Sequence, residues 1–208
     1  DICENGTDVY VRIIDYKTGK KDFNIVKTYY GIDIQLMVYM EAAMKLVAKM
    51  RPGKNVIPAG VFYYNISDPI VSATTESAEE IEDKIKGELR LKGMVNSDKD
   101  IAEKMDNTEG TSLNIPVSRK ADGGFDSRRS KVMNTEQFNI LGRFVDVRAI
   151  DTADRIAGGD IRRSPYKDGQ FSSCDRCPYG AVCGFSVDLP GCNYRKLKKF
   201  DDEVLWNN

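Results

Sequence analysis

An acidic residue and a lysine stand two positions apart at the end of an apolar segment. They are Asp15 and Lys17, at the end of the alternating segment from Val9 to Lys17. Side chains two residues apart on a strand leave the same face, so the carboxylate and the ammonium are aimed at one point. A carboxylate can hold Mg²⁺ while an ammonium orients or polarises an attacking water. The spacing therefore predicts metal-assisted phosphodiester hydrolysis.

Neighbouring residues supply further polar groups. The side chain of Tyr16 faces away from Asp15, but its backbone carbonyl can reach a metal ion bound there. Gln35 and Tyr39 share one stripe of an otherwise apolar predicted helix, because they are four residues apart. Buried polar groups need partners, so this pair either bonds to nearby backbone or faces the site of the preceding strand. An Asp-x-Lys pattern alone is also typical of a surface strand that ends in charged residues.

Four of the five cysteines are clustered near the end of the chain. Cys174, Cys177, Cys183 and Cys192 follow a C-x2-C-x5-C-x8-C spacing, whereas Cys3 stands alone. Such clustering favours a reducing compartment and thiolate ligation of a metal or cluster, with buried structural thiols as the alternative. Thiolates suit both iron–sulfur clusters and Zn²⁺. Cys192 would complete a tetrahedral zinc site, so both assignments stay open.

Composition excludes several classes of protein. The 208 residues are 41% hydrophobic and 30% charged, which suits one or two domains with a real core. No apolar run approaches the ~20 residues that span a bilayer, so we expect no membrane segment. Histidine is absent, which excludes His-dependent catalysis and His-ligated metals. The net charge is −1, so nucleic acid would be bound by a local patch such as Arg128, Arg129 and Lys131, although these residues also suit a solvated face.

The elements that position the Asp-x-Lys pair are predicted from periodicity and turn signals. We expect a strand over Val9–Lys17 as the second arm of a hairpin, then a polar connection over Thr18–Thr28. A helix buried on most of its surface should follow from about Tyr30 to Met50, ended by Arg51-Pro52-Gly53. A central strand is predicted over Val56–Ser67. Strand, helix and strand in this order imply an α/β core.

The rest of the chain gives weaker signals. Residues 76–106 are rich in charged residues and suit solvated helices with a loop near Gly93, and residues 107–131 have loop composition. A helix is expected from Asn134 to about Gly158. The remainder is basic and rich in cysteine.

The order of motifs resembles a known family. The strand I-D-Y-K, the helix with Q-x-x-x-Y and the following strand are similar to the RecB-type nucleases of the PD-(D/E)XK superfamily. RIIDYKTGKKDF, AGVFYYNISDPI, the DGGF loop and GDIRRSPY extend the resemblance over nearly the whole chain, to the nuclease regions of bacterial helicase-nucleases. The resemblance implies a mixed sheet flanked by helices in a nuclease core over residues 1–170, with a helical insertion, and a Cys-rich module over residues 171–208.

The resemblance also implies functions and partners. It implies a cytoplasmic, Mg²⁺-dependent DNA exonuclease that processes double-strand breaks with an AddA-type helicase-nuclease subunit and cuts the 5′-terminated strand. Asp15 would be a metal carboxylate, Lys17 the catalytic lysine, and Gln35 and Tyr39 the helical motif. In the family, three cysteines spaced as Cys174, Cys177 and Cys183 hold a 4Fe–4S cluster with a fourth, distant cysteine.

One departure from the family affects the expected activity. The family carries another metal-binding Asp on the hairpin arm before the Asp-x-Lys strand, and Asp1 matches a residue beyond that position. We therefore expect the first hairpin arm to be mostly missing, the Asp to lie outside this sequence, and the chain by itself to be a poor nuclease. A non-catalytic DNA-binding module stabilised by a Cys-bound metal is the alternative function.

Overall fold

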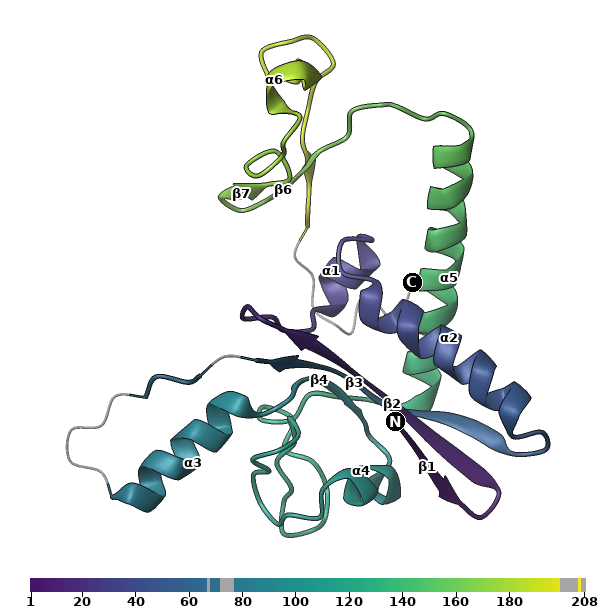
Figure 1. Ribbon diagram of the computed structural model, residues 1–208, viewed down its shortest axis with the longest axis vertical. Helices are drawn as coiled ribbons and strands as arrows, with labels where there is room; N and C mark the ends of the chain where they lie inside the picture. The colour runs from purple at the N-terminus through teal and green to yellow at the C-terminus, as the bar shows by residue number, and fades with distance from the viewer. Residues whose placement is uncertain (67, 72–76, 199–205, 207–208) are drawn as a thin grey trace. The chain divides into compact units, whose positions relative to one another are not determined.

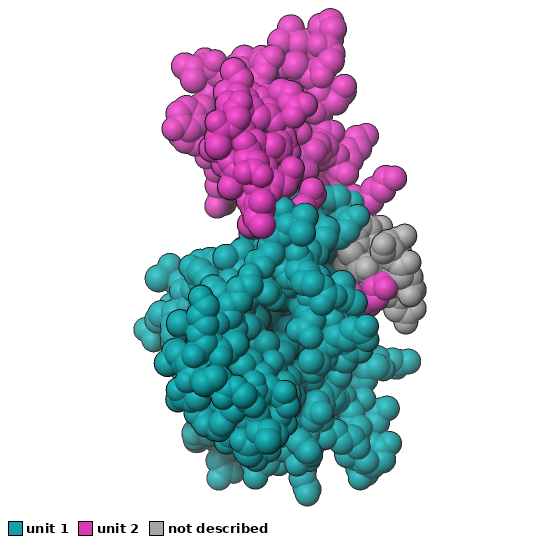
Figure 2. All heavy atoms as spheres, turned by 90° about the vertical axis from the view of Figure 1, so that its right-hand side faces the viewer, with its two compact units in different colours: residues 1–147 teal, residues 148–208 magenta. Residues whose placement is uncertain are grey.

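The computed structural model describes residues 1–66, 68–71, 77–198 and 206. It divides into two compact units, residues 1–147 and residues 148–208, which Figure 2 colours separately. The predicted boundary between residues 170 and 171 falls inside the second unit, which contains all four clustered cysteines. No helix in the described part of the chain is both long enough and apolar enough to cross a membrane.

A mixed five-stranded sheet forms the centre of the first unit (Figure 1). Its strands run in the order β1-β2-β3-β4-β5, with antiparallel pairing of β1 with β2 and of β3 with β4, and parallel pairing elsewhere. The bounds are Ile2–Asn5 for β1, Asp8–Lys17 for β2, Asn55–Asn65 for β3, Lys92–Asn96 for β4 and Val132–Met133 for β5. The predicted α/β class, the Asp-x-Lys strand and the central strand are confirmed.

The β1–β2 hairpin is short. Strand β1 pairs with residues 8–11 of β2, so the described hairpin has a four-residue first arm where the sequence predicts almost none. Arg12 exchanges hydrogen bonds with Asp1, and beyond Arg12 the described residues of β2 pair only with β3. Among the described residues, none pairs with the other edge of β2 at Asp15 to Lys17, and this edge is called the open edge below.

The connection from β2 to β3 contains two helices instead of one. Helix α1 spans Ile25–Tyr29, inside the predicted polar connection, and α2 spans Gln35–Met50. Gly31, at φ 74°, donates to Thr28, and Ile32 donates to Lys27, which is the Schellman arrangement that ends a helix. The predicted helix start at Tyr30 is therefore wrong. Its predicted end at Arg51 is confirmed.

Helix α2 packs one face against the sheet. Leu36, Met37, Met40 and Val47 are buried, whereas Leu46 and Met50 are exposed. The expectation of a helix buried on most of its surface is wrong, because the apolar residues on its outer face stay in solvent. Burial of one stripe is the usual arrangement for a helix on a sheet.

Strand β4 shows that another prediction is wrong. Gly93, expected in a loop, lies in the middle of β4 and pairs with Phe62 of β3. A Cβ atom at Gly93 would stand 1.9 Å from the Val61 carbonyl oxygen. Glycine permits this close approach of the two backbones, although it weakens strand propensity. The sequence does not predict this strand, because the residues around Gly93 are rich in charge.

The structure contains helices in the charged region where the sequence predicts them. Helix α3 spans Ala78–Leu89 and begins with a capping box between Ser77 and Glu80; α4 spans Lys99–Met105 and is capped by Asp98. Residues of α4 and of the loop over residues 107–131 cover one face of the sheet. The apolar side chains that pack there are Tyr10, Ala59, Phe62, Val95, Ile101, Ala102, Ile115 and Val117.

Helix α5, Thr135–Ala157, confirms the long helix predicted near the end of the core. The side chains of Asn134 and Gln137 each accept a hydrogen bond from the other's backbone N–H, which fixes its start. Its first half packs against α1 and α2 through a stacked Tyr29–Phe144 pair and a Lys45–Asp146 ion pair. The fold thus places α2 and α5 together, with α2 against the sheet.

The second unit contains a small sheet in the order β7-β6-β8. Strand β6 spans Tyr166–Asp168, β7 spans Phe171–Ser172 and β8 spans Arg195–Lys196. The short helix α6, Gly180–Cys183, follows the first two clustered cysteines.

Candidate active site

Four side chains predicted from the sequence meet where α2 packs against β2. The Nζ atom of Lys17 lies 2.7 Å from Oδ2 of Asp15 and donates a hydrogen bond of 2.9 Å to Oε1 of Gln35. Nε2 of Gln35 in turn donates to the Tyr39 hydroxyl at 2.8 Å. The four side chains are brought together because strand alternation places Asp15 and Lys17 on the face that α2 covers.

Asp15 retains an oxygen that can bind something more. Its Oδ2 atom is buried and accepts no hydrogen bond from any described residue, although the Lys17 ammonium is close. The ion pair and the missing hydrogen bond are compatible, because the contact satisfies the distance but not the angles of a hydrogen bond. A buried carboxylate oxygen of this kind is suited to a cation or a water.

Tyr63 forms the floor of the site. It pairs with Asp15 in the β2–β3 register, is 1% exposed, and its hydroxyl has no hydrogen-bond partner among the described residues. The Nζ atoms of Lys17 and Lys21 lie 5.6 Å and 5.7 Å from the centre of its ring. Burial, together with the negative charges of Asp33 and Asp15, raises the pKa of Tyr63 to about 12. The hydroxyl therefore stays protonated at neutral pH.

A second ion pair lies near Tyr63. Nζ of Lys21 lies 2.7 Å from Oδ1 of Asp33, whose side chain is largely buried. The backbone of Lys21 is held by a 3.0 Å hydrogen bond to Asn65, and the Asp33 carbonyl accepts one from the Thr28 hydroxyl. Two acid–lysine pairs therefore lie near one tyrosine.

The backbone carbonyl of Tyr16 is available at the open edge of β2. Arg12 exchanges hydrogen bonds with Asp1 on the β1 side, and alternate residues of a strand direct their backbone groups to the same side. By this alternation the Tyr16 carbonyl points to that side as well, beyond the end of β1. The exposed Tyr16 side chain leaves the opposite face from Asp15 and contacts Tyr64.

These donors fit one Mg²⁺ ion sparsely. Mg²⁺ is commonly bound by one or two carboxylates and keeps several waters. The free Oδ2 of Asp15 and the Tyr16 carbonyl are oxygen ligands of the required type. No three or more Cys, Asp or Glu side chains gather into a metal-holding group in the described part of the chain. We therefore expect weak Mg²⁺ binding by the chain alone.

The three residues of the predicted basic patch differ in their surroundings. Arg128 and Arg129 are exposed on a turn in which Asp126 accepts hydrogen bonds from both of their backbone N–H groups. Lys131 instead forms an ion pair with Asp22, at 2.6 Å. The structure thus leaves the two arginines as the stronger candidates for phosphate contact.

The clustered cysteines all have free thiols. Cys174 and Cys177 stand at the two ends of one turn, and Cys183 ends α6. Within the described ranges, neither the first three thiols nor a set that includes Cys192 is brought into a metal-holding group. The residues as placed do not fit a cluster or zinc ion, so both assignments stay predictions from the spacing.

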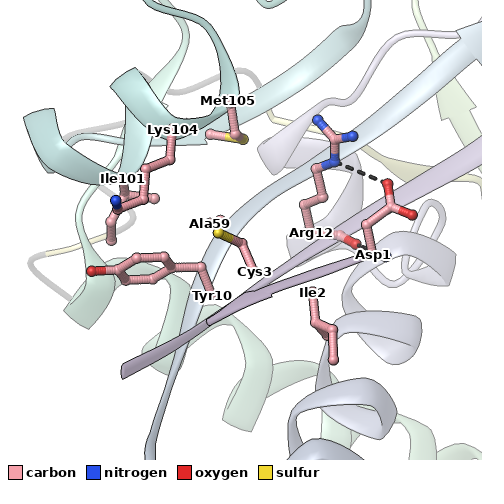
Figure 3. Close-up of a pocket in the computed structure, with 9 residues that line it drawn as sticks. All are labelled: Asp1, Ile2, Cys3, Tyr10, Arg12, Ala59, Ile101, Lys104 and Met105. Carbon is pink, nitrogen blue, oxygen red and sulfur yellow. Dashed lines mark hydrogen bonds and ion pairs between the residues drawn. The ribbon is translucent and has the colours of Figure 1, made fainter. Parts of the chain in front are cut away.

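Two cavities adjoin the sheet. Figure 3 shows one of about 230 Å³ between β1, β2 and α4, on the face opposite Asp15, where Arg12 is ion-paired with Asp1. It contains none of the predicted site residues. The other, of about 610 Å³, shares Lys21 and Asn65 with the active site and is also lined by Lys20 and Lys92. The second cavity therefore adjoins the active site.

Sequence reasoning did not identify Tyr63, Lys21 or Asp33 as site residues. Tyr63 looked like one aromatic in a buried strand, and its place beside Asp15 depends on the β2–β3 register. Lys21 and Asp33 lie in connections. No periodic signal in the sequence could have joined them.

The sequence is similar to known nucleases and helicase-nuclease subunits. Residues 1–184 match the family model of the PD-(D/E)XK nuclease superfamily. The chain is 36% identical over 209 residues to a protein of a Thermoanaerobacter species that is named as a subunit of an ATP-dependent helicase/deoxyribonuclease, covering 100% of this chain and 18% of that protein. Proteins of the same name from Caldanaerobacter subterraneus and Clostridium acetobutylicum are 38% and 36% identical, again over 18% of their length. The chain thus spans less than a fifth of these relatives.

Proposed function

This chain belongs to the PD-(D/E)XK nuclease superfamily, and we propose that it hydrolyses DNA phosphodiester bonds with the help of Mg²⁺. The observation that carries the proposal is the contact of Lys17 with Gln35 and with the buried Oδ2 atom of Asp15, which accepts no hydrogen bond from a described residue. An ammonium group held by two acceptors has a fixed position, which is what orientation of a water or a phosphate requires.

The residues have distinct roles in this proposal. Asp15 and the Tyr16 carbonyl bind the cation, which when bound supplies Lewis-acid polarisation of the phosphate. Lys17 places its positive charge beside the reacting phosphate and offsets the negative charge that develops there. Gln35 accepts a hydrogen bond from Lys17, and Tyr39 accepts one from Gln35, so the helix holds the lysine in place.

The biological setting follows from the relatives. They are named as subunits of an ATP-dependent helicase/deoxyribonuclease, an activity that suits the resection of DNA double-strand breaks. We infer that the chain supplies the nuclease of such a machine, acts in the cytoplasm with an AddA-type helicase-nuclease subunit, and cuts the 5′-terminated strand. Linear duplexes labelled at either 5′ or 3′ ends test the polarity. Progressive loss from the 5′ end is expected, and loss from the 3′ end contradicts it.

A non-catalytic DNA-binding module is the second candidate. The exposed Arg128 and Arg129 and the sparse metal ligands favour it. The two functions differ in one experiment, in which excess chain is mixed with linear duplex DNA and millimolar Mg²⁺, and binding and cleavage are both followed. Cleavage that EDTA stops and Lys17→Met removes supports the nuclease. Binding without cleavage, both by the chain and by a version extended upstream to restore the family's hairpin arm, supports the second candidate and overturns the first.

The cysteine cluster is part of the proposed domain. The spacing of Cys174, Cys177 and Cys183 supports a 4Fe–4S cluster, and Cys192 permits zinc instead. Metal and sulfide analysis of anaerobically purified protein separates these outcomes. Iron with sulfide, lost in Cys177→Ala and kept in Cys3→Ala, supports the cluster. Stoichiometric zinc that depends on Cys192 contradicts it.

A further inference from the structure

Two buried polar atoms of the active site make no hydrogen bond to any described residue, although one of them, Oδ2 of Asp15, lies 2.7 Å from the Lys17 ammonium. They are the Tyr63 hydroxyl and the Oδ2 atom of Asp15, and these residues are direct neighbours across β2 and β3. Unpartnered buried groups are uncommon in native proteins, and a bound water or a catalytic role is the usual explanation. Two such atoms on one row of the sheet indicate a shared partner.

The surroundings of Tyr63 indicate what that partner is. Two ion pairs lie near its ring, Asp15 with Lys17 and Asp33 with Lys21, and both lysine nitrogens lie over the ring. A phenol hydroxyl donates one hydrogen bond and two carboxylates accept. The two acid–lysine pairs have no net charge, which favours a neutral partner. A water can accept a hydrogen bond from the phenol and donate to both acids.

We propose that Tyr63 and Asp33 hold a water molecule beside Asp15 and that Tyr63 is thereby a positioning residue of the nuclease. A buried water needs two to four polar partners, and the phenol with the two carboxylates provides them. The water donates its hydrogens to the carboxylates, and the phenol donates to one lone pair of its oxygen. The other lone pair is left toward the cation or the phosphate. This inference rests on the proposed function, because it assigns the water to hydrolysis.

A merely structural tyrosine gives a different expectation. If the ring of Tyr63 only fills the core, removal of its unpartnered hydroxyl leaves cleavage unchanged and does not reduce stability. If the hydroxyl positions the water, Tyr63→Phe slows cleavage although the fold is as stable as before. The substitution removes a single oxygen and keeps the ring, so the two roles separate cleanly.

The kinetic test uses single-turnover cleavage of linear DNA with Mg²⁺. We expect Tyr63→Phe to lower the maximal rate at least about tenfold with little change in half-saturating DNA, and Asp33→Asn to act in the same direction. Because both residues hold one water, the double variant should be no slower than the worse single variant. Tyr10→Phe, a buried tyrosine on the opposite face of β2, is the matched control. A wild-type rate in Tyr63→Phe, or losses that multiply in the double variant, overturns the proposal.

A crystal structure of the metal-free protein gives a readout that is independent of activity. An ordered water within hydrogen-bond distance of Tyr63 and Asp33, absent in Tyr63→Phe, is expected. A dry site overturns the inference even if the chain cleaves DNA. If the water is present but neither the chain nor a version extended upstream to restore the family's hairpin arm cleaves DNA, the proposed nuclease function fails while the water site stands.

Discussion

The Lys17 ammonium donates a 2.9 Å hydrogen bond to the side-chain oxygen of Gln35, joining the end of β2 to the first turn of α2. The same nitrogen contacts Asp15. One lysine therefore links the carboxylate of the strand to the polar stripe of the helix. Its position depends on both partners.

Gln35→Met should slow DNA cleavage about tenfold, equivalent to about 1.4 kcal/mol of transition-state stabilisation. Methionine keeps the length of the side chain but removes the acceptor of Lys17 and the donor to Tyr39. Single-turnover rates check this, with Lys49→Met on the exposed face of α2 as control. An unchanged rate in folded Gln35→Met would show that Lys17 does not need the helix.

The fold could be predicted where the pattern is strong and local. The alternation of residues 9–17 and the stop at Arg51 gave the correct strand and helix end. Helix α1 was missed because a five-residue helix leaves little periodicity, and β4 because Gly93 looks like a loop residue. Gly93 is explained only by the Val61 carbonyl beside it, which sequence alone does not reveal.

Gly93→Ala tests that explanation. The added methyl group would overlap the Val61 carbonyl, so the free energy of unfolding should fall by about 1–3 kcal/mol. Gly87→Ala is the matched substitution, because Gly87 lies in α3 with open space around it and should gain about 0.5–1 kcal/mol. Urea denaturation measures both. Equal stability of Gly93→Ala and the wild type would refute the close approach.

Part of the active site could also be predicted from local periodicity in the sequence. Asp15 and Lys17 are two residues apart, and Gln35 and Tyr39 four apart, so local periodicity aligned each pair. Tyr63, Lys21 and Asp33 reach the site through strand register and through connections. Long-range geometry of this kind leaves no spacing to read in a single sequence.

Acid should destabilise the protein through Asp106. Burial disfavours its charge, but hydrogen bonds from Ser112, Thr108 and Asn114 outweigh burial and lower the pKa of Asp106 from 3.8 to about 2. Because the folded pKa is depressed, the stabilisation is present above pH ~4 and is lost as pH falls toward 2.

Asp106→Asn isolates this contribution. Wild type should exceed the variant by about 2 kcal/mol in free energy of unfolding above pH ~4, with the gap closing on acidification. Chemical denaturation across this pH range measures the gap. A constant difference at all pH values would count against the titration of Asp106.

Reversing the charges of Arg128 and Arg129 should weaken DNA binding. If each arginine contacts one phosphate, Arg128→Glu with Arg129→Glu should lower the slope of log affinity against log salt by about 2. Fluorescence anisotropy over a salt series measures the slope. The control is the double charge reversal Lys49→Glu with Lys84→Glu, at residues of helices α2 and α3. Identical slopes for the wild type and the arginine variant would show that these arginines lie on a solvated face and do not contact phosphates.

The central claim is that Asp15 holds the catalytic cation beside Lys17. The most direct measurement is the Mg²⁺-dependent, single-turnover cleavage rate of linear DNA by wild type and Asp15→Asn, each extended upstream to restore the family's hairpin arm. The substitution keeps the shape of the side chain and removes its charge. Asp83→Asn, exposed on α3, is the matched control. We predict a loss of at least about a hundredfold in Asp15→Asn and none in Asp83→Asn. Equal rates of wild type and Asp15→Asn would contradict the account.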